Sequence, residues 1–423
     1  MNKPVILIIT HVIPYPPSAG NEIRILKMMA WLRSLGLHIV LLLNHRPAED
    51  VIAGLRTIAD EVHIAGDYKV TEQAPLQLSR SELLLGLATR KPLLKSLLGR
   101  TGLLEHLEYK AKAAGTRRWL CPQELLVAAS HLNESLRPDV VLAEYIFTAR
   151  CLDIFPASTY KIIDTHDMFS RKKEQVLDFG IKDPLLCTEK EERGLLLKSD
   201  LIIAIQDNEA DMFRRLVPER KVVTVGIDFE VSAPPSDAVT DPATVLVVGS
   251  ESPLNVHGLK EFYQQAWPRI RKACNGATLK IIGKVGNHLE VSDQSVVKLG
   301  WVESLEAEYH RATVVINPIP SGTGLKIKSV EALCLGKALV STANGVEGIS
   351  AEPGCDTPYI CCSSWDSFAD ATVSLLQSGE KRRALENTAI AYAREKFSTQ
   401  QTYASLLQAL PLQGATPSTS PSR

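Results

Sequence analysis

Apolar and polar residues alternate in blocks along the chain, and the blocks predict strands and helices in turn. Residues 5–10, VILIIT, form a continuous apolar run, which is typical of a strand covered on both faces. Residues 22–36 then repeat their apolar positions at helical spacing on one face, at Ile25, Met29, Leu32 and Leu35. A second apolar run at 38–44 completes a strand–helix–strand unit, which predicts the opening of a doubly wound parallel sheet.

The alternation pauses once and then restarts. Further strands are predicted in the first half at 139–145, 160–167, 200–205 and 221–227. The segment around 228–244 is rich in proline, serine and aspartate, as linkers are. Strands are predicted after it at 244–250, 278–283, 296–302, 313–319 and 337–342.

This pattern predicts an α/β protein with two doubly wound domains. We expect a first domain at 1–228, a linker at 229–243 and a second domain at 244–390. A helix at 391–410 can cross back to the first domain, and the tail at 411–423 has the low-complexity composition of disorder. In such a fold a ligand binds in the cleft at the carboxyl ends of the strands.

Length and composition exclude several classes of protein. The chain has 423 residues, enough for two domains of about 200 residues each. Its formal net charge of −1 argues against a dedicated nucleic-acid binder, which carries a basic excess. No apolar run approaches the roughly 18 residues of a membrane-spanning helix, and the first residues predict a buried strand instead of a signal peptide.

The cysteines and histidines give no sign of a metal site. The eight cysteines include no CxxC pair and no cluster with histidine at metal-ligand spacing. We therefore expect reduced thiols, a cytoplasmic location and no bound metal.

One region breaks the strand–helix rhythm. From Ser79 to Arg118 the chain carries nine lysines and arginines against three glutamates, with leucine-rich segments between them. This composition suits peripheral contact with an anionic membrane surface. The alternative is a helical insertion with a solvated basic face.

The segment VVINPIPSGTGLKIKSVEALCLG, residues 314–336, has the pattern of strand, glycine loop and helix. Gly322 and Gly324 permit positive φ and close approach of a ligand to the backbone. Lys326 and Lys328 are expected in the first helical turn, where cations are unfavourable unless an anion offsets them. We interpret the loop and lysines as a diphosphate site, with Glu331 holding a ribose diol; the alternative is a glycine turn with a surface ion pair.

Two groups near predicted strand ends are candidate catalytic residues. His166 and Asp167 follow the strand at 160–167, where a histidine beside an acid can move a proton or orient a hydroxyl. The alternative is a His–Asp pair that caps the next helix. Glu144, at the end of the preceding strand, is a second candidate.

The segment GTGLKIKSVEALCLGKALVSTANGVEGI resembles the donor-binding signature of the group 1 glycosyltransferases of GT-B fold. VLVVGSESPLNVHGLKEFYQQAWPRIR, LKIIGKVG and VVKLGWVES occur in the order expected of that family, and PYPPSAGNEIRILKMMAWLRSLGLHIVLL is similar to its opening loop and helix. The resemblance implies two Rossmann-like domains facing across a cleft. It also implies a retaining transferase that uses a nucleoside-diphosphate sugar and no further cofactor. No carboxylate-rich DxD-type motif is evident near the expected cleft, which is consistent with a metal-independent reaction.

Residue roles follow from the same resemblance. It implies that Glu331 binds the ribose hydroxyls, that Lys326 and Lys328 lie near the diphosphate, and that the backbone of Gly322–Gly324 lies near the phosphates and sugar. It places Trp301 and Val302 beside the nucleobase, and Gly20 in a loop that approaches the donor phosphate or the acceptor.

The sequence departs from the family at two places. Many members have a glutamate that contacts the sugar where this chain has Thr323. Many also have an arginine and a lysine after the first strand of the second domain, where Ser250 and Asn255 stand here. These departures leave the donor sugar open.

The resulting function is transfer of a sugar to an acceptor hydroxyl in glycan or polysaccharide biosynthesis. The acceptor can be a saccharide, a lipid-linked molecule or a small molecule. A sugar-nucleotide epimerase of the same fold and a non-catalytic nucleotide-sugar-binding protein remain alternatives. A dinucleotide-dependent oxidoreductase is disfavoured, because neither first loop carries G-x-G-x-x-G.

Overall fold

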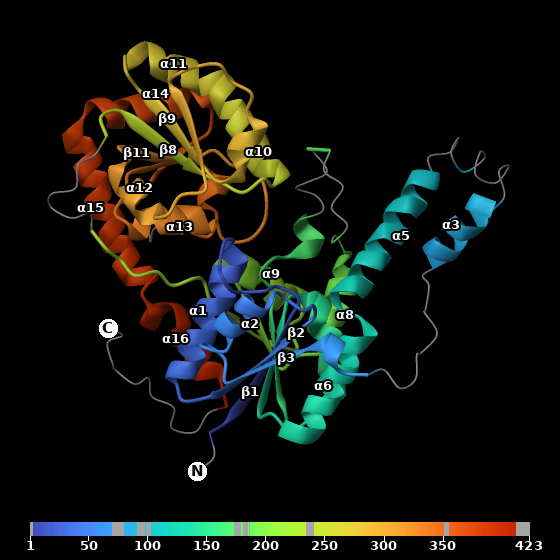
Figure 1. Ribbon diagram of the computed structural model, residues 1–423. Helices are drawn as coiled ribbons and strands as arrows, with labels where there is room; N and C mark the ends of the chain where they lie inside the picture. Colours follow the sequence, from blue (N-terminus) through green and yellow to red (C-terminus); the bar gives the residue numbers. More distant parts are fainter. Residues whose placement is uncertain are drawn as a thin grey trace. The chain divides into compact units, whose positions relative to one another are not determined.

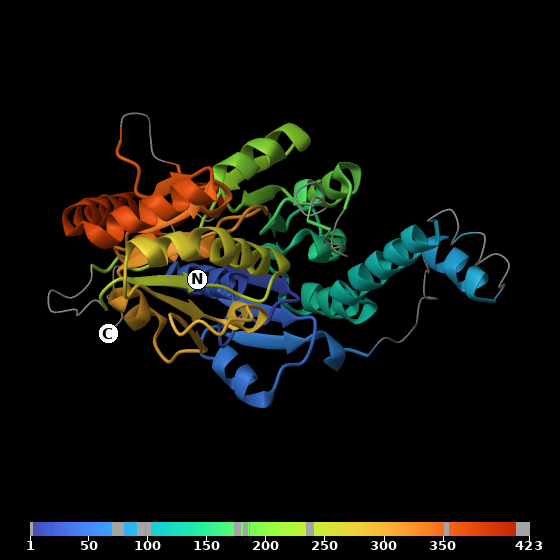
Figure 2. The same cartoon turned by 90° about the horizontal axis from the view of Figure 1, so that it is seen from above.

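The computed structural model describes residues 3–69, 80–90, 98, 103–172, 179–180, 185, 187–233, 241–350 and 355–411. The chain divides into two compact units. Unit 1 comprises Met1–Ile205, Glu209–Thr224 and Ala409–Arg423, and unit 2 comprises Gln206–Asn208 and Val225–Gln408. Each unit has one parallel sheet with helices packed against it (Figures 1 and 2). This confirms the predicted α/β class with two doubly wound sheets.

The sheet of unit 1 has seven parallel strands in the order β3-β2-β1-β4-β5-β6-β7. The strands are β1 Val5–Thr10, β2 His38–Leu43, β3 Glu61–Ile64, β4 Val140–Glu144, β5 Tyr160–Asp164, β6 Leu201–Ala204 and β7 Lys221–Thr224. The central strands β1, β2 and β4 are buried along almost their whole length, because helices cover both faces of the sheet.

Helices on both faces bury the apolar side chains of this sheet. On one face, Leu7 and Ile9 of β1 pack in a cluster with Leu125 and Ala128 of α6. The helices are α1 Gly20–Ser34, α2 Glu49–Leu55, α3 Arg80–Arg90, α5 Leu103–Leu120, α6 Gln123–Leu136, α8 Glu189–Leu196 and α9 Asp207–Leu216, with 3-10 segments η1 Ala65–Asp67 and η2 Ile146–Ile154.

The sheet of unit 2 has six parallel strands in the order β10-β9-β8-β11-β12-β13. The strands are β8 Thr244–Val248, β9 Thr278–Ile282, β10 Val296–Gly300, β11 Val314–Asn317, β12 Leu339–Thr342 and β13 Ile360–Cys362. The first helix after β8 passes through one π-helical segment, η3, without a break in the chain's helical course. The helical elements are α10 Pro253–Glu261, η3 Phe262–Ala266, α11 Trp267–Ala273, η4 Lys284–His288, α12 Leu305–Arg311, α13 Ile327–Cys334, η5 Asn344–Val346, α14 Trp365–Gln377, α15 Gly379–Lys396 and α16 Thr399–Ala409.

Strand order fixes where a ligand can enter each sheet. In unit 1 the order reverses between β1 and β4, and in unit 2 it reverses between β8 and β11. Loops from two strands that flank such a reversal leave in opposite directions and open a crevice at the carboxyl ends. The loops after β1, β4, β8 and β11 are therefore the places to look for a site.

The hydrophobic pattern did not predict two edge strands, β3 and β13. β3 carries Glu61 and His63 in four residues, and β13 is only three residues long, so neither gives an apolar run. Part of the basic region at 79–118 and residues 412–423 of the expected tail lie outside the described residues. Among the helices that are described, none combines the length and the apolarity needed to cross a membrane.

Candidate functional site

The glycine loop of unit 2 follows β11 directly, at the reversal of strand order. Gly322 has φ 125° and Gly324 has φ 76°, conformations that L side chains rarely adopt. The loop also packs closely against α10, since a Cβ on Gly258 would lie 2.3 Å from the carbonyl oxygen of Pro318. The sequence of this segment is thus dictated by backbone geometry at the carboxyl edge of the sheet.

Lys326 braces this loop from the inside. Its Nζ donates to the carbonyl oxygens of Gly322, Thr323 and Gly324 at 3.1, 2.8 and 3.1 Å. The side chain is buried, and Lys326 is the N-cap of α13, so it precedes the first turn in which the sequence placed it. Because the three carbonyls point at the ammonium, the adjoining amides face away from it, as they do in an anion-binding nest.

Lys328 and Glu331 lie on the same face of α13, as their spacing predicts. Lys328 Nζ is 3.4 Å from Glu331 Oε2, and the hydroxyl of Tyr309 donates to the same oxygen at 3.1 Å. Tyr309 is fully buried, and burial beside Glu331 holds the pKa of its hydroxyl well above the usual value. Tyr309 therefore stays a hydrogen-bond donor and fixes the carboxylate.

A second turn supports the glycine loop from β12. Asn344 Nδ2 donates to the carbonyl oxygen of Gly322 at 2.7 Å and to Glu347 Oε2 at 2.9 Å. The side chain of Thr323, at the position where the family has glutamate, has an Oγ1 with no hydrogen-bond partner among the described residues. This hydroxyl is buried as well as unpaired among those residues.

The remaining predicted donor residues also lie at strand ends of unit 2. Asn255 Nδ2 donates to Ser250 Oγ at 3.0 Å, so these two residues form one local group after β8. Trp301 and Val302 follow β10, and Trp301 is 86% exposed. A tryptophan with so much apolar surface in water is a ready contact for a planar ligand group.

In unit 1 the predicted catalytic histidine, His166, pairs with Glu144 and not with its sequence neighbour Asp167. His166 Nε2 lies 2.6 Å from Glu144 Oε2, and both side chains are buried. The neighbouring Asp167 is instead 3.3 Å from Lys172 Nζ. The His166–Glu144 pair joins two of the candidates across adjacent strands β4 and β5.

A buried ion pair supports this histidine. Arg24 of α1 donates through Nε and Nη2 to the two carboxylate oxygens of Asp164, at 3.0 and 2.8 Å. Asp164 Oδ2 is also 3.6 Å from His166 Nε2. The bidentate geometry compensates two charges that would be costly if buried alone.

The backbone is strained at the same place. His166 has φ 57° and Tyr145 has φ 65° with ψ 150°, a region occupied almost only by glycine. The two rings stack with centroids 4.1 Å apart and planes 3° from parallel, and Asn21 Nδ2 donates to the hydroxyl of Tyr145 at 3.1 Å. Strain of this kind persists where surrounding contacts enforce it, and it is concentrated at functional sites.

Burial sets the protonation of these groups. It raises the pKa of Glu144, against the opposing effect of the hydrogen bond to His166. It also lowers the pKa of His11 to about 4, helped by repulsion from His166 and His45. His11 is therefore neutral at pH 7, and burial favours the protonated form of Glu144 at its short contact with His166.

Glu144, Asp164 and His166 are also the group among the described residues whose ligand atoms come close enough together to hold a metal ion, within 4.8 Å. Both oxygens of Asp164 accept from Arg24, and Glu144 Oε2 contacts His166. A cation there would face the guanidinium of Arg24. The donor set fits a hydrogen-bonded Glu144–His166 pair next to an ion pair better than a metal centre.

Gly20 is the first residue of α1, in the loop that leaves β1. The amides of Ser18 and Ala19 donate to Glu22 Oε2 at 2.6 and 2.9 Å, so a carboxylate of the protein already caps this helix. The predicted approach of Gly20 to donor or acceptor stays a prediction.

Sequence reasoning missed Arg24, Asp164, Tyr145 and His11. Arg24 carried one signal, because it is a charged residue on the apolar face of α1, and such a residue is buried only with a partner. Asp164 lay inside an apolar strand and gave the same signal. Nothing in the sequence indicates the positive φ of Tyr145.

Comparisons with known proteins agree with this geometry. Residues 242–378 match a family model described as glycosyl transferases group 1. A comparison with curated proteins finds no match.

Solved glycosyltransferases share the fold over nearly the whole chain. TarM matches with a TM-score of 0.68 at 10% identity, covering 96% of this chain and 98% of that one. Sucrose-phosphate synthase from Thermosynechococcus elongatus matches with a TM-score of 0.64 at 14% identity, covering 96% and 98%. HepE from Anabaena, solved with UDP and glucose, matches with a TM-score of 0.63 at 14% identity, covering 96% and 100%.

The fold is therefore GT-B, with two Rossmann-like domains. Residues 242–378, about a third of the chain, match the group 1 glycosyltransferase family model.

Proposed function

We propose that the chain transfers a sugar from a nucleoside-diphosphate sugar to an acceptor hydroxyl, in glycan or polysaccharide biosynthesis in the cytoplasm. The observation that carries this proposal is the loop after β11. It combines two positive-φ glycines, a lysine that braces three carbonyls, and a carboxylate held by Tyr309 on the helix that follows.

The donor is bound mainly by backbone. The amides between Gly322 and Leu325 and the start of α13 bind the diphosphate, and the half-buried Lys328 supplies a positive charge in the first turn of that helix. Glu331 accepts from the ribose hydroxyls, and the hydroxyl of Thr323 contacts the transferred sugar. Ser250 and Asn255 line the donor phosphates, and Trp301 and Val302 flank the base.

The chemistry needs charge stabilisation on the leaving group more than it needs a base. Departure of the nucleoside diphosphate places negative charge on the phosphate oxygens, which a helix N-terminus and lysine stabilise without a metal. His166, paired with Glu144, orients the acceptor hydroxyl or receives its proton. Retention of the anomeric configuration is proposed from the family alone.

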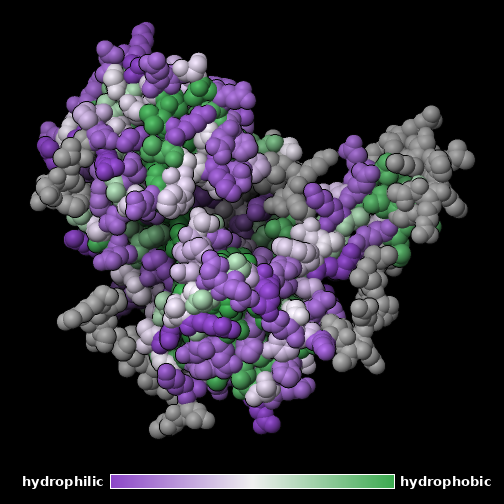
Figure 3. All heavy atoms as spheres, viewed as in Figure 1, coloured by the Kyte–Doolittle hydropathy of each residue, from purple (hydrophilic) through white to green (hydrophobic). Residues whose placement is uncertain are grey.

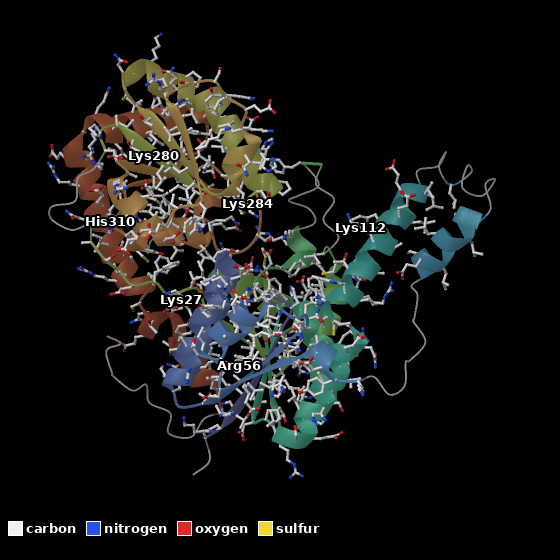
Figure 4. All side chains as sticks on the ribbon, in the orientation of Figure 1. Lys27, Arg56, Lys112, Lys280, Lys284 and His310 are labelled. Carbon is white, nitrogen blue, oxygen red and sulfur yellow. The ribbon has the colours of Figure 1, made fainter. Side chains whose placement is uncertain are left out.

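Peripheral membrane contact is proposed for α3 and α5. Leu83, Leu84 and Leu87 on α3 are 52, 48 and 49% exposed, and green hydrophobic surface lies among purple positions there (Figure 3). Lys110 and Lys112 on the neighbouring helix α5 are exposed, and Lys112 points outward from the helix (Figure 4). Exposed leucines and lysines on two packed helices suit an anionic bilayer surface, and such a membrane would deliver a lipid-linked acceptor.

Vesicle sedimentation tests the membrane contact. We expect the protein to sediment with phosphatidylglycerol vesicles and to be released by replacing the three leucines with serine. Equal sedimentation with pure phosphatidylcholine vesicles, or no effect of the serine variant, would contradict this contact.

A thermal-shift panel tests the donor site. UDP, GDP, ADP, CMP and NAD are compared on wild type and Glu331→Ala, with UDP first because HepE and TarM structures contain it. A nucleotide present at 100 times its Kd adds about 2.7 kcal/mol to the free energy of unfolding. We expect one nucleoside diphosphate to raise the Tm of wild type and not of Glu331→Ala.

The control is Glu306→Ala, which removes a glutamate from the first turn of α12. This variant should keep the nucleotide response. A response to NAD alone, or no response to any nucleoside diphosphate, would reject the donor site.

A further inference from the structure

Aromatic rings follow four neighbouring strands of unit 1. His45 comes two residues after β2, His11 one after β1, Tyr145 one after β4, and His166 two after β5. These strands are adjacent in the order β2-β1-β4-β5, at a spacing of about 4.8 Å between neighbours. The rings therefore form a row along the carboxyl edge of the sheet.

Most neighbouring rings of the row contact each other directly. His166 stacks on Tyr145 at 4.1 Å between centroids, and Tyr145 lies 4.8 Å from His11. His45 is near enough to His11 to lower its pKa. At the outer end, His45 stacks on Trp119 at 4.3 Å with planes 29° apart.

The outer pair is held in place by one side chain. Asn44 is buried, and its Nδ2 lies 2.8 Å from the carbonyl oxygen of Trp119 and 3.1 Å from His45 Nε2. This amide ties the end of α5 to the end of β2. Trp119 nevertheless leaves 56% of its surface in water, whereas His166 at the inner end is 6% exposed.

The rings become more exposed from His166 to Trp119, and such a row suits a ligand with repeated apolar faces. A rigid tryptophan exposed at a fixed place offers a large contact area at little entropic cost on binding. The Nδ1 atom of His11, in the middle of the row, is buried without a hydrogen-bond partner among the described residues. A ligand that combines apolar faces with hydroxyl groups would satisfy both the rings and this nitrogen.

We propose that this row, His166–Tyr145–His11–His45–Trp119, is an extended saccharide subsite for the acceptor. The reacting hydroxyl lies at His166, and a more distant sugar ring stacks on Trp119. The inference rests on the proposed function, and it narrows the acceptor to one with at least two sugar rings. Trp119 is a specificity residue here, since it lies at the far end of the row from His166.

The membrane surface proposed for α3 is a separate feature. Trp119 lies near the last residue of α5, about 24 Å along the helix from Leu103 at its start. Loss of vesicle binding by Trp119→Ala would assign this tryptophan to the membrane and overturn the saccharide subsite.

The test is saccharide binding by the full-length protein in the absence of donor. An array of mono- to tetrasaccharides of hexoses, N-acetylhexosamines and uronic acids identifies bound sugars, and titration calorimetry compares the shortest and longest of them. We expect affinity to rise with length in wild type. Trp119→Ala should lose about tenfold for the longer sugars and little for the monosaccharide.

Two further variants separate a ring contact from general damage. Trp119→Phe keeps an aromatic face and should recover most of the affinity. Leu103→Ala removes another exposed apolar side chain of α5, 45% exposed, and should bind like wild type.

Affinity that does not depend on length, equal losses in Trp119→Ala and Leu103→Ala, or no sugar bound anywhere on the array would each overturn the proposal. The nucleotide response of Glu331→Ala and wild type is measured on the same preparations. A normal nucleotide response with no saccharide binding rejects the subsite alone, whereas loss of both rejects the proposed function.

Discussion

The carboxyl edges of the two sheets differ in the groups that they present: buried side chains in unit 1 and backbone groups in unit 2. In unit 1 the edge carries buried side chains: Arg24 grips Asp164 with two hydrogen bonds, and His166 contacts Glu144 at 2.6 Å. In unit 2 the edge carries glycines with positive φ and carbonyls gathered around Lys326. The same strand order thus supports a site of titratable side chains in one unit and a site of backbone amides in the other.

The difference matches what the proposed donor and the proposed acceptor would each need. A diphosphate has fixed charge and is bound well by backbone N–H groups, which bring no titration of their own. An acceptor hydroxyl must be oriented and relieved of a proton, which requires side chains with adjustable pKa. We therefore expect unit 1 to be sensitive to loss of charge partners and to pH, and unit 2 to be sensitive to loss of loop geometry.

The largest effect is expected for Arg24→Met. This change leaves Asp164 buried without its partner, and breaking a buried pair in this way costs about 3–5 kcal/mol. Urea unfolding measures the loss. Arg33→Met on the same helix is the control: Arg33 is 45% exposed, lies 3.9 Å from Asp60 and donates to the carbonyl oxygens of Thr57 and Ile58, so its loss should cost about 0.5–1.5 kcal/mol. Equal losses in the two variants would show that the pair at Asp164 is not a buried charge pair.

The next largest effect is the pH dependence due to His11. Its folded pKa of about 4 lies below the ordinary value of 6.5, so the unfolded chain binds more protons between these two pH values. Stability from neutral His11 is complete above pH 6.5 and is lost as pH falls toward 4, by up to about 3 kcal/mol.

His11→Gln should remove this slope. The raised pKa of Glu144 acts with the opposite sign above pH 4.5, so the measurement is the difference in unfolding free energy between wild type and variant across pH 4–7. A difference that stays constant with pH would mean that His11 is solvated in the folded protein.

Lys326→Met tests the backbone-built site of unit 2. It removes the donor shared by the carbonyls of Gly322, Thr323 and Gly324, at a cost of about 1–3 kcal/mol even without ligand. Lys328→Met removes a part-buried i,i+3 pair and should cost about 0.2–0.5 kcal/mol. Urea unfolding of both variants shows whether Lys326 stabilises the loop itself or acts only by binding phosphate. If the two variants are equally stable and only nucleotide binding falls, Lys326 contacts phosphate and does not shape the loop.

The same contrast explains what the sequence could predict. The central strands, the glycine loop and the pairing of Lys328 with Glu331 follow from local rules of periodicity and spacing, and the structure has them. The Arg24–Asp164 and His166–Glu144 contacts join residues 140 and 22 positions apart, and only the strand order brings them together. The sequence favoured Asp167, the neighbour of His166, as its partner. In the structure His166 has a positive φ, and its ring contacts Glu144 at the end of β4 instead.

Tyr309→Phe is expected to have a smaller effect than Lys326→Met, and it tests how Glu331 is positioned in the proposed donor site. The variant keeps the buried ring and removes only the hydroxyl that donates to Glu331 Oε2, worth about 0.5–1.5 kcal/mol. If Glu331 binds the ribose hydroxyls, this loss appears as several-fold weaker binding of UDP, measured by calorimetry. With 2′-deoxy-UDP the effect should shrink, since the ligand no longer offers the full diol that the oriented carboxylate recognises. An equal loss with both ligands would mean that the Tyr309 hydroxyl acts through the packing of α12 against α13. Glu331 would then not recognise the ribose diol, and the donor site would depend on the backbone of the loop alone.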